Sequence, residues 1–310
     1  MILQETSTLA NGVSIPRLGL GTWFVSDTAV VPAVGEALRL GYRHVDTAPA
    51  YRNEQGVGRA VRSSGVPRDE VFVTTKVDAG AKTYGAARDG IDASLRRTGL
   101  DHLDLVLVHS PTPWRRFGGE ERYLEENRQV WRALEEALAA GTVRAIGLSN
   151  FEVADVDNIF EGCTVAPMVN QVLAHISNTP HDLIRHCRDR GILVEAYSPV
   201  AHGELLKNEV VARVAQRYAV SVPQLSIRYC LQLGLLPLPK SADPAHLRAN
   251  AEVDFTITEE DMDLLRGVEP IADYGDHRAM TIYGGRRDVR SLLALARGTL
   301  RSRVRPQRGR

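Results

Sequence analysis

Residues 42–64, YRHVDTAPAYRNEQGVGRAVRSS, contain the pattern from which the fold of this chain can be predicted. A short apolar run over 42–46 ends at an aspartate, and a helical pattern follows over 54–64 and ends before Gly65. Glycine commonly ends a helix because it adopts the left-handed conformation at little cost. The stretch therefore predicts a β-strand, a polar loop and an α-helix, in that order.

The same alternation recurs along the chain. Short apolar or β-branched runs, each ending in a polar residue, occupy 17–22, 42–46, 71–76, 103–109, 143–150, 168–171, 192–198 and 235–241. Helical patterns lie between or after them, at 29–40, 54–64, 84–98, 122–140, 152–160, 181–190, 208–219 and 259–266. Strands that alternate with helices indicate a parallel sheet, and eight such units close most naturally into a (β/α)₈ TIM barrel.

The two ends of the chain depart from this alternation. Residues 6–16 predict a small β-hairpin with its turn at Asn11-Gly12, and Asp27 or Thr28 is expected to cap the first helix. One barrel domain is expected over 1–275, followed by a C-terminal loop and tail over 276–310. That tail holds ten Arg and two Asp, a net charge of +8. A solvated, partly disordered tail is expected, with anion or nucleic-acid binding as the alternative.

The composition of the 310 residues excludes several classes of protein. Lys and Arg together number 38, as do Asp and Glu, so a wholly basic nucleic-acid binder is disfavoured. Three cysteines without a C-x-x-C pair favour neither a disulfide framework nor a metal site. The N-terminus lacks a signal-peptide pattern and no apolar run is long enough to span a membrane. A cytoplasmic location is therefore expected.

The residues that end the predicted strands are all polar. In a (β/α)₈ barrel these ends form the active site. Singly, each has a plainer interpretation: Asp46 as a helix cap, Lys76 as a solvated lysine, His109 as a hydrogen-bonded core histidine. Together, a ring of donors and ionisable groups indicates catalysis rather than packing. Its members are Thr22, Asp46, Lys76, His109, Asn150, Gln171, Ser198 and Ser241.

Several familiar motifs are incomplete. The run GLGTWF at 19–24 lacks the third glycine of a dinucleotide-binding turn, and GLSNF at 147–151 lacks the second glycine of a nucleophile elbow. No Walker A sequence and no H-E-x-x-H is present. A Rossmann NAD domain, a serine hydrolase of the elbow type, a P-loop ATPase and a zincin are therefore disfavoured.

The motifs that are complete resemble those of the aldo-keto reductase superfamily. The family's D-T-A-x-x-Y-x-N-E element is present in full as DTAPAYRNE at 46–54. The other matching motifs follow in order as TTK (74–76), LVLVH (105–109), IGLSNF (146–151), NQV (170–172), EAYSPV (195–200) and LPKS (238–241). The resemblance runs from about residue 6 to about residue 270. It implies a barrel that binds a nicotinamide cofactor without a Rossmann fold and reduces aldehydes and ketones to alcohols.

The resemblance implies a catalytic tetrad of Asp46, Tyr51, Lys76 and His109. Tyr51 would give the proton to the substrate oxygen, and a free tyrosine with a pKa of about 10 is a weak acid. The Lys76 ammonium, held by Asp46, would lower that pKa. His109 would orient the carbonyl by a hydrogen bond. The alternative for Tyr51 is a loop tyrosine that covers the barrel mouth.

The resemblance also implies where the cofactor and substrate bind. Ser149, Asn150 and Gln171 would hold the nicotinamide carboxamide, and Tyr197 would stack on the ring. The remaining cofactor contacts would come from Gly21, Thr22, Asp46, Ser198, Pro199, Val200, Lys240, Ser241, Ala242, His246 and Asn250. The substrate would contact Trp23, Tyr51, His109, Ser110 and Trp114. The alternative for Trp23 is a core tryptophan.

Two departures from the family pattern bear on specificity. Where members that prefer NADPH carry an arginine at the adenosine site, this chain has His246, with Arg248 two residues on. A modest preference for NADPH over NADH is therefore expected, since arginine grips a phosphate better than histidine does. Many members have a tryptophan directly after the catalytic histidine, where this chain has Ser110. Trp114 is expected to restore part of that apolar wall.

The function expected from these patterns is NADPH-dependent reduction of a small-molecule aldehyde or ketone by a monomer. Two alternatives come from other classes. The first is a nicotinamide-binding regulatory barrel that turns over slowly and binds a partner. The second is a barrel isomerase or aldolase in which Lys76 forms a Schiff base. No nucleic acid or membrane partner is expected.

Overall fold

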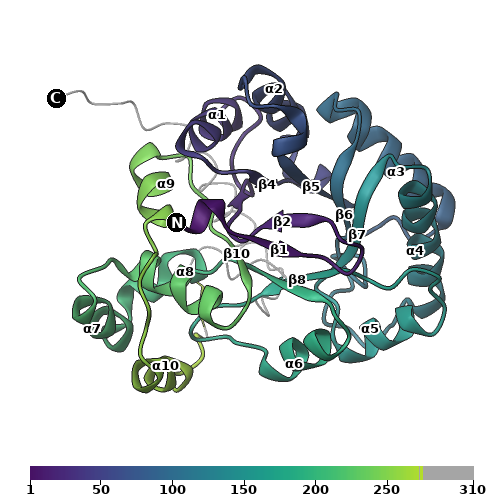
Figure 1. The fold of residues 1–310 in the computed structure, drawn as a ribbon. Coiled ribbons are helices and arrows are strands. Elements are labelled where there is room, and N and C mark those ends of the chain that lie inside the picture. The colour runs from purple at the N-terminus through teal and green to yellow at the C-terminus, as the bar shows by residue number, and fades with distance from the viewer. Residues whose placement is uncertain (272, 275–310) are drawn as a thin grey trace.

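A computed structural model of the chain describes residues 1–271 and 273–274 and contains an eight-stranded parallel barrel (Figure 1). Around the barrel the strands follow one another in chain order from β3 to β10. They are β3 (Leu20–Gly21), β4 (His44–Asp46), β5 (Phe72–Val77), β6 (Leu103–Val108), β7 (Val143–Ser149), β8 (Val169–Leu173), β9 (Leu193–Tyr197) and β10 (Leu236–Leu238). The predicted (β/α)₈ fold is confirmed, and each of the eight apolar runs overlaps one strand.

The barrel closes where its first and last strands meet. Gly21 forms a parallel bridge with Lys240, and its amide donates to the Pro239 carbonyl at 3.0 Å. A Cβ at Gly21 would lie 3.0 Å from the Leu238 carbonyl oxygen, closer than most side chains tolerate. Glycine therefore allows the two strands to approach and seal the sheet.

The helices surround the barrel, as Figure 1 shows. They are α1 (Val30–Leu40), α2 (Glu54–Ser63), α3 (Tyr84–Thr98), α4 (Leu124–Ala139), α5 (Val153–Phe160), α6 (His181–Asp189), α7 (Glu209–Arg217), α8 (Val222–Gln232), α9 (Pro244–Ala251) and α10 (Glu259–Arg266). The predicted bounds of α3 are confirmed because Thr83 caps its start and Gly99, at φ 63°, ends it. Neither α8 nor α9 was among the helices predicted.

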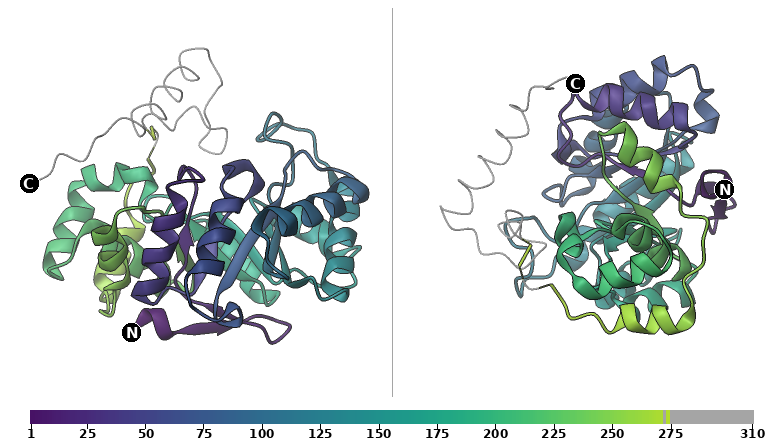
Figure 2. Two further views of the ribbon diagram at one scale, coloured as in Figure 1. Left: turned by 90° about the horizontal axis from the view of Figure 1, so that it is seen from above. Right: turned by 90° about the vertical axis from the view of Figure 1, so that its left-hand side faces the viewer.

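The N-terminal hairpin lies across the opposite end of the barrel from the loops that follow the strands (Figure 2). Its strands are β1 (Thr6–Thr8) and β2 (Ser14–Pro16), and Gly12 adopts φ 86° in the turn. The Asn11 amide donates to the Arg144 carbonyl at the start of β7. The predicted hairpin is confirmed, and it covers the N-terminal ends of the strands.

The prediction that Asp27 or Thr28 caps α1 is wrong. The backbone amide of Ala29, which precedes the helix, donates to Ser26 Oγ at 3.2 Å. Asp27 instead accepts from the Gly56 amide at 2.6 Å and pairs with Arg59 at 2.6 Å. Its carboxylate thus ties the loop before α1 to helix α2, and this long-range partner is not visible in the local sequence.

The central strands are buried on both faces, one toward the barrel interior and the other toward the helices. Every residue of β5 and of β6 is buried. Burial of a large aliphatic side chain contributes about 1.5–3 kcal/mol each. Within the described residues, no helix is both long and apolar enough to cross a membrane. The predicted C-terminal tail over 276–310 lies outside the described residues.

Candidate active site

An ion pair lies at the base of the main cavity. Asp46 ends β4, and Lys76 lies near the end of the adjacent strand β5. Lys76 Nζ donates to the two Asp46 carboxylate oxygens at 2.8 and 2.6 Å, and to the Thr47 carbonyl at 3.1 Å. The lysine side chain is only 1 % exposed. Because the strands are parallel neighbours and Lys76 lies two residues beyond the register partner of Asp46, both side chains reach the carboxyl end of the barrel.

Tyr51 covers this ion pair. It ends a short 3₁₀ turn, Pro49–Tyr51, in the loop after β4. Its ring centroid lies 5.0 Å from Lys76 Nζ and 5.9 Å from the His109 ring. Burial, and next the Asp46 charge, raise the pKa of Tyr51 well above its ordinary value. The net shift is thus upward, opposite to the lowering expected from Lys76, because burial outweighs the stabilisation that the ammonium can give to a phenolate.

His109 directly follows β6 and lines the cavity beside Tyr51. Burial, and next the nearby Lys76 charge, hold the pKa of this imidazole well below its ordinary value. A neutral imidazole carries one N–H, so His109 can donate one hydrogen bond toward the cavity or toward the protein. Its Nδ1 has no partner among the described residues.

Of the residues expected to form the substrate wall next to His109, Trp114 lines the cavity and Ser110 does not. Trp114 packs edge-on against the His109 ring with centroids 5.0 Å apart, and Phe117 packs on Trp114 at 5.6 Å. Trp23 also lines the cavity, and its ring centroid lies 6.3 Å from that of Tyr51. Ser110, predicted to contact substrate, does not line the cavity: it is fully buried, and its hydroxyl accepts from the Thr112 amide at 3.3 Å.

The residues expected to hold a carboxamide line one wall of the cavity. Ser149, Asn150, Gln171 and Tyr197 all do so. Asn150, at φ 61°, donates to the His109 carbonyl and to Ser149 Oγ, both at 3.0 Å. The Tyr197 hydroxyl donates to Asn150 Oδ1 at 2.7 Å. This wall is thus held by its own hydrogen bonds.

One buried residue behind that wall was not predicted. Glu195, on β9, has no exposed surface and accepts from Gln171 Nε2 at 2.7 Å. Burial, and next the Asp46 charge, raise the pKa of Glu195 to about 8. The signal in the sequence is an acidic residue inside an apolar strand, which is rare unless its carboxyl group has a partner.

The cavity extends from Tyr51 along β9 and β10 and has a volume of about 900 Å³. The predicted cofactor residues line this cavity only in part. Besides the carboxamide wall, those on its lining are Gly21, Asp46, Ser198, Pro199, Val200, Lys240, His246 and Asn250. His202 and Leu206, from the 3₁₀ segment Ala201–Lys207, also line it and were not predicted.

Three predicted cofactor residues do not line the cavity. The Thr22 hydroxyl donates to the Asp46 carbonyl at 2.8 Å, and Ser241 Oγ accepts from the Asp243 amide at 3.0 Å. Ala242 is exposed outside the cavity. Arg248, the expected substitute for a phosphate-binding arginine, is also absent from the lining. Together with Arg39, which acts more strongly, it lowers the pKa of Glu36 on α1.

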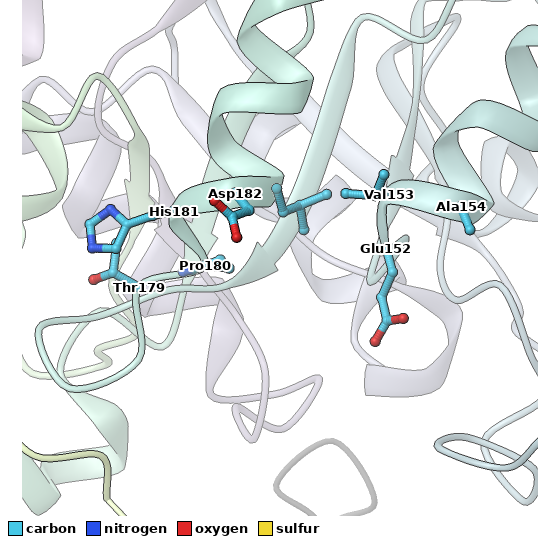
Figure 3. Close-up of a pocket in the computed structure, with 8 residues that line it drawn as sticks. Glu152, Val153, Ala154, Thr179, Pro180, His181 and Asp182 are labelled. Atoms are coloured by element: carbon cyan, nitrogen blue, oxygen red, sulfur yellow. The ribbon is translucent and has the colours of Figure 1, made fainter.

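A second hollow of about 730 Å³ lies between the N-terminal ends of α5 and α6 (Figure 3). It shares no lining residue with the main cavity. The Glu152 carboxylate at its edge is used in the capping box of α5. The tetrad residues all lie elsewhere, so the main cavity is the candidate active site. Among the described residues, no cluster of His, Cys, Asp and Glu could hold a metal ion.

A barrel with a buried Lys–Asp pair, a tyrosine and a histidine at the carboxyl ends of its strands defines an oxidoreductase of the carbonyl-reducing class. A model of the Aldo/keto reductase family matches residues 17–270. The chain belongs to this family, and it is an oxidoreductase that acts on carbonyl groups with a nicotinamide cofactor.

Known relatives and solved structures agree with this assignment. The chain is 39% identical over 263 residues to the glyoxal reductase of Bacillus subtilis (strain 168). The matched region covers 84% of this chain and 91% of that relative. It is 40% identical over 260 residues to the 9,11-endoperoxide prostaglandin H2 reductase of Trypanosoma cruzi (strain CL Brener), covering 82% and 88%. The crystal structure of a Bombyx mori aldo-keto reductase in complex with NADP has a TM-score of 0.77 at 31% identity, covering 84% of this chain and 92% of that chain.

Proposed function

We propose that this protein is an NADPH-dependent reductase of small aldehydes or ketones, with Tyr51 as the proton donor. The observation that carries the proposal is the convergence of Tyr51, His109 and the Lys76–Asp46 pair at one end of an elongated cavity. Relatives named as a glyoxal reductase and as a glycerol 2-dehydrogenase (NADP(+)) support a small oxygenated substrate.

The lining of the cavity fits a nicotinamide cofactor. Gln171 lines the wall, and its side-chain oxygen accepts no hydrogen bond from the described residues. It can therefore receive an N–H from a carboxamide. Farther along, the side-chain nitrogens of Lys240 and His246 can donate hydrogen bonds to a 2′-phosphate. When bound, the cofactor supplies the hydride that adds to the carbonyl carbon.

The chain's own residues supply the proton and the orientation. The carbonyl oxygen of the substrate would lie between the Tyr51 hydroxyl and the His109 imidazole, which donates a hydrogen bond to it. As negative charge develops on that oxygen, the Tyr51 O–H bond breaks and the proton moves to it. The phenolate that remains lies beside the Lys76 ammonium, which stabilises it. The Asp46 carboxylate keeps this ammonium in place.

The cofactor preference and the setting are part of the same proposal. We expect NADPH to be preferred and NADH to be accepted more weakly, because His246 and Lys240 line the cavity whereas Arg248 does not. We also propose that the protein acts as a cytoplasmic monomer with no nucleic acid or membrane partner. The three cysteines are all free, which suits a reducing compartment.

The test is a cofactor-dependent activity screen of the purified chain. NADPH oxidation is followed with glyoxal, aromatic aldehydes, sugars and keto acids as substrates, and NADH is compared in parallel. The proposal predicts turnover of at least one small aldehyde with NADPH, and a loss of turnover in Tyr51→Phe. Binding of NADPH without turnover of any carbonyl compound would instead favour a regulatory barrel.

A further inference from the structure

The amide group of Gln171 has a defined orientation. Its nitrogen donates one hydrogen bond to Asp46 Oδ2 at 2.9 Å and the other to Glu195 Oε2 at 2.7 Å. Both N–H groups of the amide are therefore used inside the barrel. The oxygen at the other end of the amide accepts nothing from the described residues, and Gln171 belongs to the cavity lining.

Carboxyl groups on two different strands impose this orientation. Asp46 is ion-paired to Lys76 and so acts only as an acceptor toward Gln171. A flipped amide would place its oxygen against the oxygens of Asp46 and Glu195, a repulsive contact in a region from which water is excluded. With Asp46 alone, one N–H of Gln171 would lack a buried partner, and the amide could rotate away to find one.

The polar groups around Glu195 come from other strands of the barrel, and only Gln171 donates a hydrogen bond to it among the described residues. It faces Asp46 and His44 from β4, Lys76 from β5 and Gln171 from β8, and it pairs in register with Leu236 on β10. His44 Nε2 lies 3.9 Å from Glu195 Oε1, beyond hydrogen-bond distance. That oxygen is unpartnered among the described residues. A carboxyl group accepts from an N–H in either protonation state, so the contact with Gln171 persists through the titration of Glu195.

We propose that Glu195 is a positioning residue: together with Asp46 it fixes the Gln171 amide so that only its oxygen is presented to the cavity. This inference rests on the proposed function, in which Gln171 contacts the nicotinamide carboxamide. The cavity then recognises a carboxamide as a donor of N–H, and it discriminates against a ring substituent that has a carbonyl oxygen but no N–H.

The probe for this discrimination is the 3-acetylpyridine analogue of NADP⁺, in which a methyl group replaces the amide NH₂. Dissociation constants of NADP⁺ and of this analogue are measured by quenching of protein fluorescence. The wild-type protein should bind NADP⁺ about tenfold more tightly than the analogue, because the analogue leaves the Gln171 oxygen unsatisfied. Equal binding of the two by the wild-type protein would overturn the proposal.

Variants at Glu195 separate orientation from folding. Glu195→Met retains length but accepts no strong hydrogen bond, so the Gln171 amide is released and the discrimination should fall below about threefold. Glu195→Gln presents a carbonyl oxygen to the same N–H and should restore most of it. Glu195→Ala replaces the methionine variant if that variant does not fold. Discrimination that stays tenfold in the apolar variants would show that Glu195 does not set the orientation.

The matched control is Glu54→Gln, which removes another buried carboxylate. Glu54 is bonded to Thr75 and Arg97 and has no contact with Gln171. It should lower stability without changing the ratio of the two dissociation constants. Failure of the proposed function has a different signature, because then the wild-type protein would bind neither NADP⁺ nor the analogue.

Discussion

Two buried aspartates, at opposite ends of the barrel, are used in different ways. Asp104, near the start of β6, pairs with Arg68 and Arg144, both at 2.7 Å, and accepts from the Val73 amide at 2.8 Å. Asp46, at the end of β4, pairs with Lys76 and accepts from Gln171 across the barrel interior. Asp104 ties neighbouring strands together, whereas Asp46 joins groups that line the cavity.

The exposure of the cations explains the difference. The Arg68 and Arg144 side chains are 21 % and 39 % exposed, so their guanidinium groups keep contact with water. Lys76 is almost completely enclosed, and its ammonium also lies 5.0 Å from the centroid of the Tyr51 ring. At the hairpin end, the buried Asp104 carboxylate is therefore neutralised by arginines that reach the surface, and these contacts stabilise the fold. At the cavity end, the Lys76–Asp46 pair is shielded from water, so its electrostatic effect on a nearby reacting group is strong.

Tyr51→Phe should give the largest effect and sharpens this comparison. Phenylalanine fills the same space next to Lys76 but has no O–H, so the proton step is lost. We expect kcat to fall on the order of 10²–10⁴-fold, while the dissociation constant of NADPH and the free energy of unfolding change little. Steady-state kinetics and fluorescence titration measure the first two. Turnover close to that of the wild type would remove Tyr51 as the proton donor.

Substituting each aspartate separately tests whether Asp104 serves stability and Asp46 serves catalysis. Asp104→Ala leaves two arginines and a buried amide without their acceptor, and should lower the free energy of unfolding by about 3–5 kcal/mol. Its kcat per folded molecule should stay within about twofold of wild type. Asp46→Asn, by contrast, should reduce kcat because the Lys76 ammonium loses its ionic partner. Urea unfolding followed by fluorescence, together with kinetics on both variants, decides this.

If Asp46→Asn lowered stability as much as Asp104→Ala and left kcat intact, the distinction between the two ends would fail. The same would follow if Asp104→Ala reduced kcat in fully folded protein. Arg59, which pairs with Asp27 at the surface of α2, offers a control: Arg59→Ala should change neither quantity by more than about 1 kcal/mol or twofold.

The pH dependence of stability tests the buried acid at the cavity end. The pKa of Glu195 is about 8 in the folded chain, against 4.5 for an unperturbed glutamate. The folded state therefore holds this proton more tightly, and the resulting stabilisation is fully present below about pH 4.5. It is lost as pH rises to about 8, at up to about 1.4 kcal/mol per pH unit.

Glu195→Gln should remove that component of the slope. The difference in unfolding free energy between variant and wild type, measured by urea denaturation from pH 5 to pH 9, isolates it from the opposing titration of His44. Burial lowers the pKa of His44 to about 3, so this histidine reduces stability as pH falls below about 6.5. A variant curve parallel to that of the wild type would mean that Glu195 is not held neutral.

The smallest expected effect is at the far end of the cavity, where His246 lines the wall. His246→Arg should tighten NADPH binding about tenfold and leave NADH nearly unchanged, because only NADPH carries the 2′-phosphate. Dissociation constants of both cofactors for the wild type and the variant measure this. Equal affinities of the wild type for NADPH and NADH, unaffected by the variant, would place the phosphate elsewhere.

The sequence predicts the strand ends well and their surroundings less well. Asp46, Lys76 and His109 could be located because each ends a recognisable apolar run. Helix α8 was not predicted because residues at nearly every position of its buried segment face other elements, so no amphipathic stripe is visible. Its capping box at Ser221 and Gln224 was the available signal.

Side-chain direction is the part that the sequence does not specify. Ser110 and Thr22 lie where the motifs place them, but their hydroxyls bond to nearby backbone rather than facing the cavity. Glu195 depends on partners from β4 and β8, which come together only when the barrel closes. Local pattern therefore fixes which residues reach the barrel mouth, and tertiary packing fixes what each one contacts.

The junction between the first and last strands has a consequence for how the protein opens. β3 has only two residues, and the sheet is sealed there by the bridge between Gly21 and Lys240, both of which line the cavity. A ligand that contacts both residues binds the barrel only while β3 and β10 are paired. By mass action it therefore disfavours separation of these two strands, so amide hydrogen exchange in β3 and β10 should slow as ligand concentration rises. Ligand binding in the cavity and strand pairing at the Gly21–Lys240 junction should therefore be thermodynamically coupled.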